Sequence, residues 1–154
     1  MYEDDEDRID AAEQLAEDHP DAAAEACSAI ACDQAVGDEV RLSAAELLAG
    51  VNPRALAPAC LAIACDEAVG DEVRLSAAEL LAGTDPRALA PACLAIACDE
   101  AVGDEVRLSA AELLADVDPG AAGRACLAVA RDATVGDEVR RSAAEQLASL
   151  DPSG

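Results

Sequence analysis

The chain repeats itself every 33 residues. The tetrapeptide Gly-Asp-Glu-Val, each time followed by Arg, begins at Gly37, Gly70, Gly103 and Gly136. Five prolines keep the same spacing: Pro20, Pro53, Pro86, Pro119 and Pro152. A fixed period of about 20 to 50 residues is typical of stacked arrays, in which each unit buries its apolar face against its neighbours. The period therefore predicts one repeat domain that spans residues 1–154.

Each period has room for two helices. The first begins at Asp38 and carries Val40, Ala44 and Leu48 at helical spacing, and Gly50 is predicted to end it in the left-handed conformation. The second begins after a polar residue followed by Pro, which is the pattern of an N-cap with Pro in the first turn. The residues in this N-cap position are His19, Asn52, Asp85 and Asp118.

Extended to all copies, the pattern predicts an all-α fold, an α-solenoid of about 4.5 stacked helix-turn-helix repeats without strands. Two of the second helices contain a proline, Pro58 or Pro91. We expect each to bend its helix, and the alternative is a helix that begins near the proline after a preceding turn. The expected helices span residues 4–17, 20–35, 38–49, 53–68, 71–82, 86–101, 104–115, 119–134 and 137–149.

The two ends of the array differ from its interior. The position of Leu47 is occupied by Gln14 in the first helix and by Gln146 in the last. A terminal repeat has one uncovered face, and this face must be polar. We therefore expect helices 4–17 and 137–149 to act as caps and the array to be a complete unit.

The chain is strongly acidic, with 33 acidic and 10 basic residues and a net charge of −23. Such a charge repels nucleic acids and anionic membrane surfaces and favours a basic protein or peptide as partner. All ten basic residues are Arg and Lys is absent, whereas idealised designed helices usually carry Glu/Lys pairs. This bias favours a natural, recently amplified repeat over an engineered array.

Seven cysteines lie in two columns that follow the repeat. Equivalent positions in stacked helices are separated by roughly 8–10 Å, whereas the Cα atoms of a disulfide must lie within about 7 Å. We therefore expect all seven cysteines to be reduced and mostly buried, as small apolar residues. We also find no signal peptide and no membrane-spanning stretch, so we expect a cytoplasmic protein. The columns are Cys27, Cys60, Cys93 and Cys126, and Cys32, Cys65 and Cys98.

The first helix of each repeat resembles HEAT-like repeats of the short type seen in phycobilisome-lyase-like proteins. The resemblance rests on Asp38-Glu39-Val40-Arg41 followed by Ala44-Ala45 and Leu48, which matches the pattern D-x-V-R-x-x-A-A-x-x-L, and it covers residues 5–149. HEAT-like repeats of this type usually run nearer thirty residues, so tetratricopeptide-type or other helical hairpins stay open. Ankyrin shares the period, but its Thr-Pro-Leu-His signature is missing here.

The resemblance implies a ladder of Asp and Arg side chains between neighbouring repeats, which would hold the stack together. Its arginines would be Arg41, Arg74, Arg107 and Arg140. Their partners would be Asp33, Asp66, Asp99 and Asp132, or instead the Asp at the start of each first helix.

Nothing in the sequence points to an enzyme, a cofactor or a metal. His19 is the only histidine, and a helix cap explains it better than catalysis. The carboxylates recur in every repeat, whereas a catalytic site is normally unique. No CxxC or HxxxH pattern is present.

We expect the chain to be a scaffold for protein binding. In HEAT-like arrays the equivalent of each first helix lines the concave face, and here that helix would present a column of glutamates with serines between them. A basic segment could pair with this column, and the alternative is a solvated face that serves solubility. The residues of the column are Glu39, Ser43, Glu46, Glu72, Ser76, Glu79, Glu105, Ser109 and Glu112.

Two other interpretations of the repeat stay open. Identical repeats offer identical faces, so the chain could assemble with itself as a homo-oligomer or filament, although we expect a monomer. It could also be an amplified or engineered array with no function of its own.

The acidic composition predicts that added salt stabilises the fold. Repulsion among the charges opposes the compact state, and salt screens it over a Debye length of about 8–10 Å near physiological ionic strength. We expect the melting temperature to rise from low to molar salt in thermal denaturation followed by circular dichroism. An unchanged melting temperature would contradict a destabilising role for the net charge.

Overall fold

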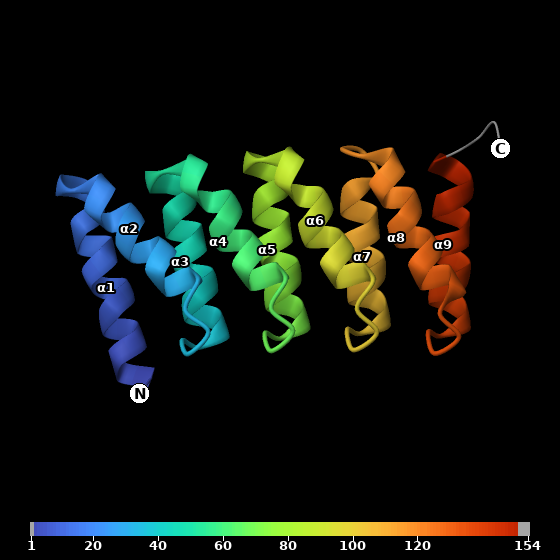
Figure 1. Ribbon diagram of the computed structural model, residues 1–154, viewed down its shortest axis with the longest axis horizontal. Coiled ribbons are helices and arrows are strands. Elements are labelled where there is room, and N and C mark those ends of the chain that lie inside the picture. Colours follow the sequence, from blue (N-terminus) through green and yellow to red (C-terminus); the bar gives the residue numbers. More distant parts are fainter. Residues whose placement is uncertain (1, 151–154) are drawn as a thin grey trace.

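The computed structural model describes the backbone of residues 2–150 and the side chains of residues 5–150. The described part of the chain is 79% helical and contains no strand. The predicted α-solenoid is confirmed: the helices pack against one another in chain order (Figure 1). The elements are α1 (Tyr2–Asp18), α2 (Pro20–Ala31), α3 (Asp38–Val51), a 3₁₀ turn η1 (Pro53–Ala55), α4 (Leu56–Ala64), α5 (Asp71–Thr84), α6 (Pro86–Ala97), α7 (Asp104–Leu114), α8 (Pro119–Arg131) and α9 (Asp137–Leu150).

The helices form two rows. The odd-numbered helices α1, α3, α5, α7 and α9 each contact the next odd helix, and the even-numbered helices α2, α4, α6 and α8 each contact the next even one. Helices of the two rows also pack on each other, and the complete repeats from α1/α2 to α7/α8 contact their neighbours through both rows. The loops that lead from an even to an odd helix lie along one edge of the stack, and the tighter odd-to-even turns lie along the other (Figure 1).

One continuous apolar core runs from Ala12 in α1 to Ala143 in α9. Its members recur in every internal repeat, for example Ala44 and Leu48 in an odd helix and Ile63 in an even helix. The chain has no Phe or Trp, so much of this core is Ala. Small side chains allow the helices to approach closely, and the core therefore depends on close contact between repeats.

The even helices end three or four residues earlier than predicted. The helix expected over 20–35 stops at Ala31, because Asp33 organises a turn that competes with the helix. Its Oδ1 atom accepts the backbone N–H of Ala35 at 2.9 Å, and its carbonyl accepts the N–H of Val36 at 3.1 Å. The same turn follows the other even helices, at Asp66, Asp99 and Asp132.

The two internal prolines have different effects. Pro91 lies inside α6, which is one helix as expected, and a bend at this position stays a prediction. The second repeat instead follows the alternative, with the 3₁₀ turn η1 before α4. Here the Asn52 side chain accepts the N–H of Arg54 at 3.3 Å, which tightens the start of the helix, whereas the side chain of Asp85 makes no cap hydrogen bond.

The N-cap positions are correctly predicted, but only some of the side chains in these positions make a capping hydrogen bond. Asp118 caps α8 by accepting the N–H of Ala121 at 3.1 Å. His19 occupies the N-cap position of α2, and its side chain makes no cap hydrogen bond. The assignment of His19 as a capping side chain is therefore wrong.

The prediction that Gly50 ends its helix in the left-handed conformation is also wrong. Gly50 lies inside α3, which continues to Val51, and no glycine among residues 2–150 has a positive φ. The helix ends instead where Asn52, at φ −150°, donates its N–H to the carbonyl of Leu48 at 2.8 Å. Gly83 has the same place in α5.

Replacing Gly50 and Gly83 by Ala should therefore stabilise the protein. A Cβ atom at either position meets nothing within 4 Å, and Ala in a helix is favoured over Gly by about 0.5–1 kcal/mol. Denaturant unfolding of the two single variants measures this gain. Gly70→Ala is the control: Gly70 is an N-cap, where Ala is disfavoured, so that variant should be less stable than the parent. Loss of stability in both helix-interior variants would contradict the assigned helix ends.

Candidate functional site

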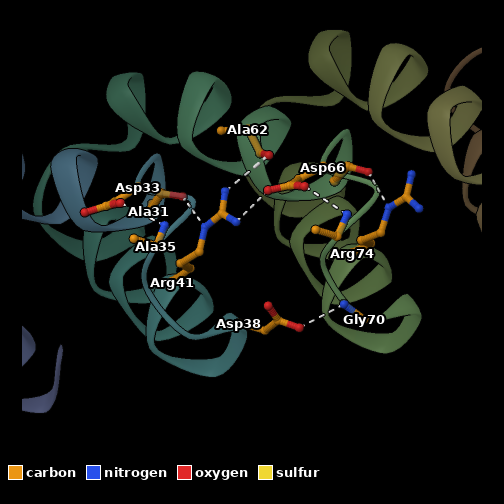
Figure 2. A network of polar contacts seen from close by, with 11 residues as sticks. Ala31, Asp33, Ala35, Asp38, Arg41, Ala62, Asp66, Gly70 and Arg74 are labelled. Carbon is orange, nitrogen blue, oxygen red and sulfur yellow. Dashed lines mark hydrogen bonds and ion pairs between the residues drawn. The ribbon is translucent and has the colours of Figure 1, made fainter. Parts of the chain in front are cut away.

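Three arginines of the odd helices are buried, with 2% of each residue exposed. Arg41 donates from Nε to the carbonyl of Ala31 at 2.8 Å and from Nη1 to Asp66 Oδ2 at 2.9 Å (Figure 2). Its Nη2 atom lies 3.4 Å from the carbonyl oxygen of Ala62. A buried guanidinium needs such partners, because a charge without them is costly to remove from water.

These contacts join successive repeats. Ala31 ends α2, whereas Asp66 lies two residues after the last residue of α4, so Arg41 connects the ends of two neighbouring even helices. A cation at a helix C-terminus also interacts favourably with the helix dipole. The same ion pair recurs twice at 2.8 Å, between Arg74 and Asp99 and between Arg107 and Asp132.

The ladder pairs each buried arginine with the aspartate that lies 25 residues later in the sequence. Asp33 accordingly pairs with Arg8, at 3.2 Å, and both side chains are about two-fifths exposed (41% and 37%). Arg140 donates to the carbonyl of Ala130 at 3.0 Å, and no ion pair of Arg140 is found among residues 5–150. The buried pairs therefore belong to the interior of the array.

The helix-start aspartates form a second ladder. Asp38 Oδ2 accepts the backbone N–H of Gly70, the N-cap of the next odd helix, at 2.9 Å (Figure 2). The same bond joins Asp5 to Gly37, Asp71 to Gly103 and Asp104 to Gly136. Sequence reasoning missed this ladder and considered these aspartates only as partners of arginine. Its only signal in the sequence is the strict recurrence of the Gly-Asp pair.

Hydrogen bonds to the ladder aspartates favour their ionised form. The Arg41 side chain, and then the N–H of Ala68, lower the pKa of Asp66 below its ordinary value. The Arg74 side chain, and then the N–H of Ala101, lower the pKa of Asp99. The Thr134 hydroxyl, followed by Arg107, lowers the pKa of Asp132 to about 2.

The nine residues of the predicted binding column lie on α3, α5 and α7, and we call them the acidic surface. Its six glutamates are exposed, and of its serines Ser43 is exposed while Ser76 and Ser109 are half-buried. Glu79 of α5 and Glu112 of α7 line one open groove of about 490 Å³ with Ser109. Side chains from two successive repeats are therefore brought together. The surface consists of Glu39, Ser43, Glu46, Glu72, Ser76, Glu79, Glu105, Ser109 and Glu112.

A larger groove of about 700 Å³ lies at the loop edge, where it includes Arg107 and Asp132. These two side chains are paired with each other, so their charges are already neutralised within the fold. The glutamates of the acidic surface differ in this respect: none of the six is in an ion pair with a residue in the range 5–150.

The cysteines are free, but the expectation that most are buried is wrong for one column. Cys27, Cys60, Cys93 and Cys126 are buried, whereas Cys32, Cys65 and Cys98 are exposed. The exposed column follows from the early end of the even helices, since each of its members occupies the C-cap beyond the packed turn. Burial raises the pKa of Cys60 and of Cys93 to about 12.

Among residues 5–150, no group of three or more His, Cys, Asp or Glu side chains could hold a metal ion. His19 is exposed at the start of α2. Of the helices between residues 2 and 150, none has the length and apolar character that a membrane crossing requires.

Comparisons with protein-family models, with curated proteins and with solved structures found no match to this chain.

The lowered aspartate pKa values predict loss of stability in acid. A carboxyl whose pKa is lower in the folded than in the unfolded state stabilises the fold above its unfolded pKa, near 3.8, and this contribution disappears as the pH falls through the folded pKa. Between pH 7 and about 5, protonation instead begins to relieve the repulsion among the acidic groups. We therefore expect the free energy of unfolding to rise on mild acidification and to fall from about pH 4 towards 2.

Urea unfolding at a series of pH values measures this profile. The matched variant carries Asp66→Asn and Asp99→Asn, which keep a side-chain oxygen for the turn but cannot ionise. This variant should be less stable at pH 7 and should lose less stability below about pH 4. An identical acid limb in parent and variant would contradict the role assigned to the two carboxylates.

The two cysteine columns predict two classes of thiol reactivity. In the native protein, an aromatic disulfide reagent should modify Cys32, Cys65 and Cys98 quickly, because they are exposed. The four buried thiols should react only at the rate of unfolding, or after denaturation. The absorbance of the released thiolate counts the cysteines of each class as they react. Reaction of all seven cysteines at one rate would contradict the burial pattern.

Proposed function

We propose that the chain is a non-enzymatic scaffold that binds a basic segment of a partner protein on the acidic surface. The observation that carries the proposal is the groove between α5 and α7, where Glu79, Ser109 and Glu112 come together from two repeats. Neighbouring odd helices repeat their glutamates at roughly the 8–10 Å distance of packed helices. An extended or helical segment with regularly spaced Arg or Lys matches such a step.

The charge distribution supports this assignment. The ladder aspartates are used within the fold, either by buried arginines or by the N-cap glycines of the next repeat. The glutamates of the acidic surface are exposed and are in no ion pair among residues 5–150, so they keep their full charge towards solvent. The net charge of −23 would speed the approach of a basic partner by electrostatic steering.

The odd helices resemble HEAT-like repeats, and this resemblance agrees with a scaffold role. We propose in addition that the chain belongs to that family and that it is cytoplasmic. The seven free cysteines favour a reducing compartment. Within this proposal the protein acts as a monomer whose repeats together present one extended binding surface.

We expect that neutralising one glutamate in each of three repeats strongly weakens binding. Glu46→Gln, Glu79→Gln and Glu112→Gln together remove three charges from the acidic surface and leave every hydrogen bond of the two ladders intact. Fluorescence anisotropy with an Arg-rich peptide as probe should show at least a tenfold loss of affinity, which corresponds to about 1.4 kcal/mol. The melting temperature should be unchanged or higher, because repulsion decreases.

The matched control changes the net charge equally at three exposed glutamates outside the acidic surface: Glu25→Gln, Glu67→Gln and Glu100→Gln. This control should bind the peptide almost as the parent does. If both triple variants lost the same amount of affinity for the peptide, net charge alone would explain the loss. That result would contradict binding at the acidic surface. Particles that grow with protein concentration in light scattering, without any partner, would favour self-assembly instead.

A further inference from the structure

The turn after α7 differs from the turns after the two preceding odd helices. α3 and α5 end at Val51 and Thr84, whereas α7 ends at Leu114, three residues earlier in the repeat. Asp116 stands here in place of a helical glycine. Its carboxylate would lie four residues after Glu112 and at the negative end of the helix dipole, and both effects oppose continuation of the helix.

The turn after α7 leaves one apolar side chain exposed. The backbone N–H of Val117 bonds to the carbonyl of Leu114 at 3.1 Å, and 40% of Val117 is open to solvent. No other large hydrophobic residue in the range 5–150 is exposed. In the earlier repeats this position is a half-buried Val51 and a polar Thr84.

Val117 lies in the groove between α5 and α7. The apolar lining of this groove includes Leu75 and Leu113, and its carboxylates are those of Glu79, Glu112 and Asp116. Glu112 and Asp116 also line the adjoining groove of about 330 Å³ between α7 and α9. The groove between α5 and α7 thus combines an apolar patch with three carboxylates from two repeats, whereas the turns that correspond to Asp116-Val117 offer Gly50-Val51 and Gly83-Thr84.

We propose that this groove is the docking site within the acidic surface, and that its occupant is a basic protein segment with an aliphatic side chain between Arg or Lys residues. The inference rests on the proposed function and names the position and the chemistry of the partner. The aliphatic side chain would cover Val117, Leu75 and Leu113, while the basic residues pair with the surrounding carboxylates. Charge complementarity selects this occupant, because a second copy of the chain, at −23, would be repelled.

The test compares two fluorescent peptides of equal charge. One has a pair of Leu residues between pairs of Arg, and the other has Ser in place of Leu. The parent protein should bind the Leu peptide about tenfold more tightly than the Ser peptide, as expected for one well-buried aliphatic side chain. Added salt should weaken both complexes and leave this ratio unchanged, because salt screens the ion pairs and not the apolar contact.

The repeat itself supplies the variants. Asp116→Gly with Val117→Thr recreates the Ala-Gly-Thr sequence that ends α5, so the fold already accommodates it in another repeat. This loss variant should bind the two peptides equally. The converse change, Gly83→Asp with Thr84→Val, builds the same turn one repeat earlier, where a Cβ atom at Gly83 meets nothing within 4 Å. Combined with the loss variant, it should restore the preference for the Leu peptide.

The outcomes separate this inference from the proposed function. The parent could bind both peptides equally while the variant with Gln at Glu46, Glu79 and Glu112 binds them more weakly. That result would contradict docking in the groove and would still support binding on the acidic surface. A Leu preference that survives in the loss variant would place the apolar contact elsewhere and also overturn the groove. If neither peptide bound the parent, both proposals would be removed.

Discussion

The buried guanidinium of each internal odd helix is the interaction on which the stack depends. Arg41 cannot be buried alone, because an uncompensated charge in the interior costs several kcal/mol in general. Its partners come from two repeats, the carbonyl of Ala31 in one and the carboxylate of Asp66 in the next. Burial of the arginine therefore requires both repeats to be folded and in register. The hydrogen bond from Gly70 to Asp38 adds a second connection between the same repeats, at the other end of the loop that joins α4 to α5.

This polar framework compensates for a core of small side chains. Alanine and cysteine bring the helices close together, but they supply less apolar area than aromatic residues would. The excess of acidic groups also opposes the compact state. Charge is thus used in two ways: aspartates at the loops stabilise contacts between repeats, whereas glutamates of the acidic surface face solvent and are in no ion pair within residues 5–150. The same separation leaves those glutamates available to a partner, and the turn at Asp116 and Val117 makes one groove differ from its neighbours.

Much of the fold could be predicted from the period alone, because copies of one sequence must adopt similar conformations. The N-cap positions followed from Pro53 and its copies. Helix ends could not be placed in the same way: the turn at Asp33 depends on a side-chain hydrogen bond that competes with the helix, and the exposure of Cys32 follows from that turn. The ladder partners required the relative position of neighbouring repeats. Nothing in the sequence distinguishes Asp33 from Asp66 as the partner of Arg41, since both recur at the same spacing.

A double-mutant cycle on Arg41 and Asp66 measures how strongly the buried ladder couples neighbouring repeats. Arg41→Met, Asp66→Asn and the double variant are compared with the parent by denaturant unfolding, and the coupling energy is the difference that the single variants do not explain. The exposed pair Arg8 and Asp33 supplies the reference cycle. We expect a coupling of about 2 kcal/mol or more for the buried pair, against roughly 0–1 kcal/mol for the exposed pair. Equal, small couplings in both cycles would contradict the claim that the buried ladder holds the repeats together.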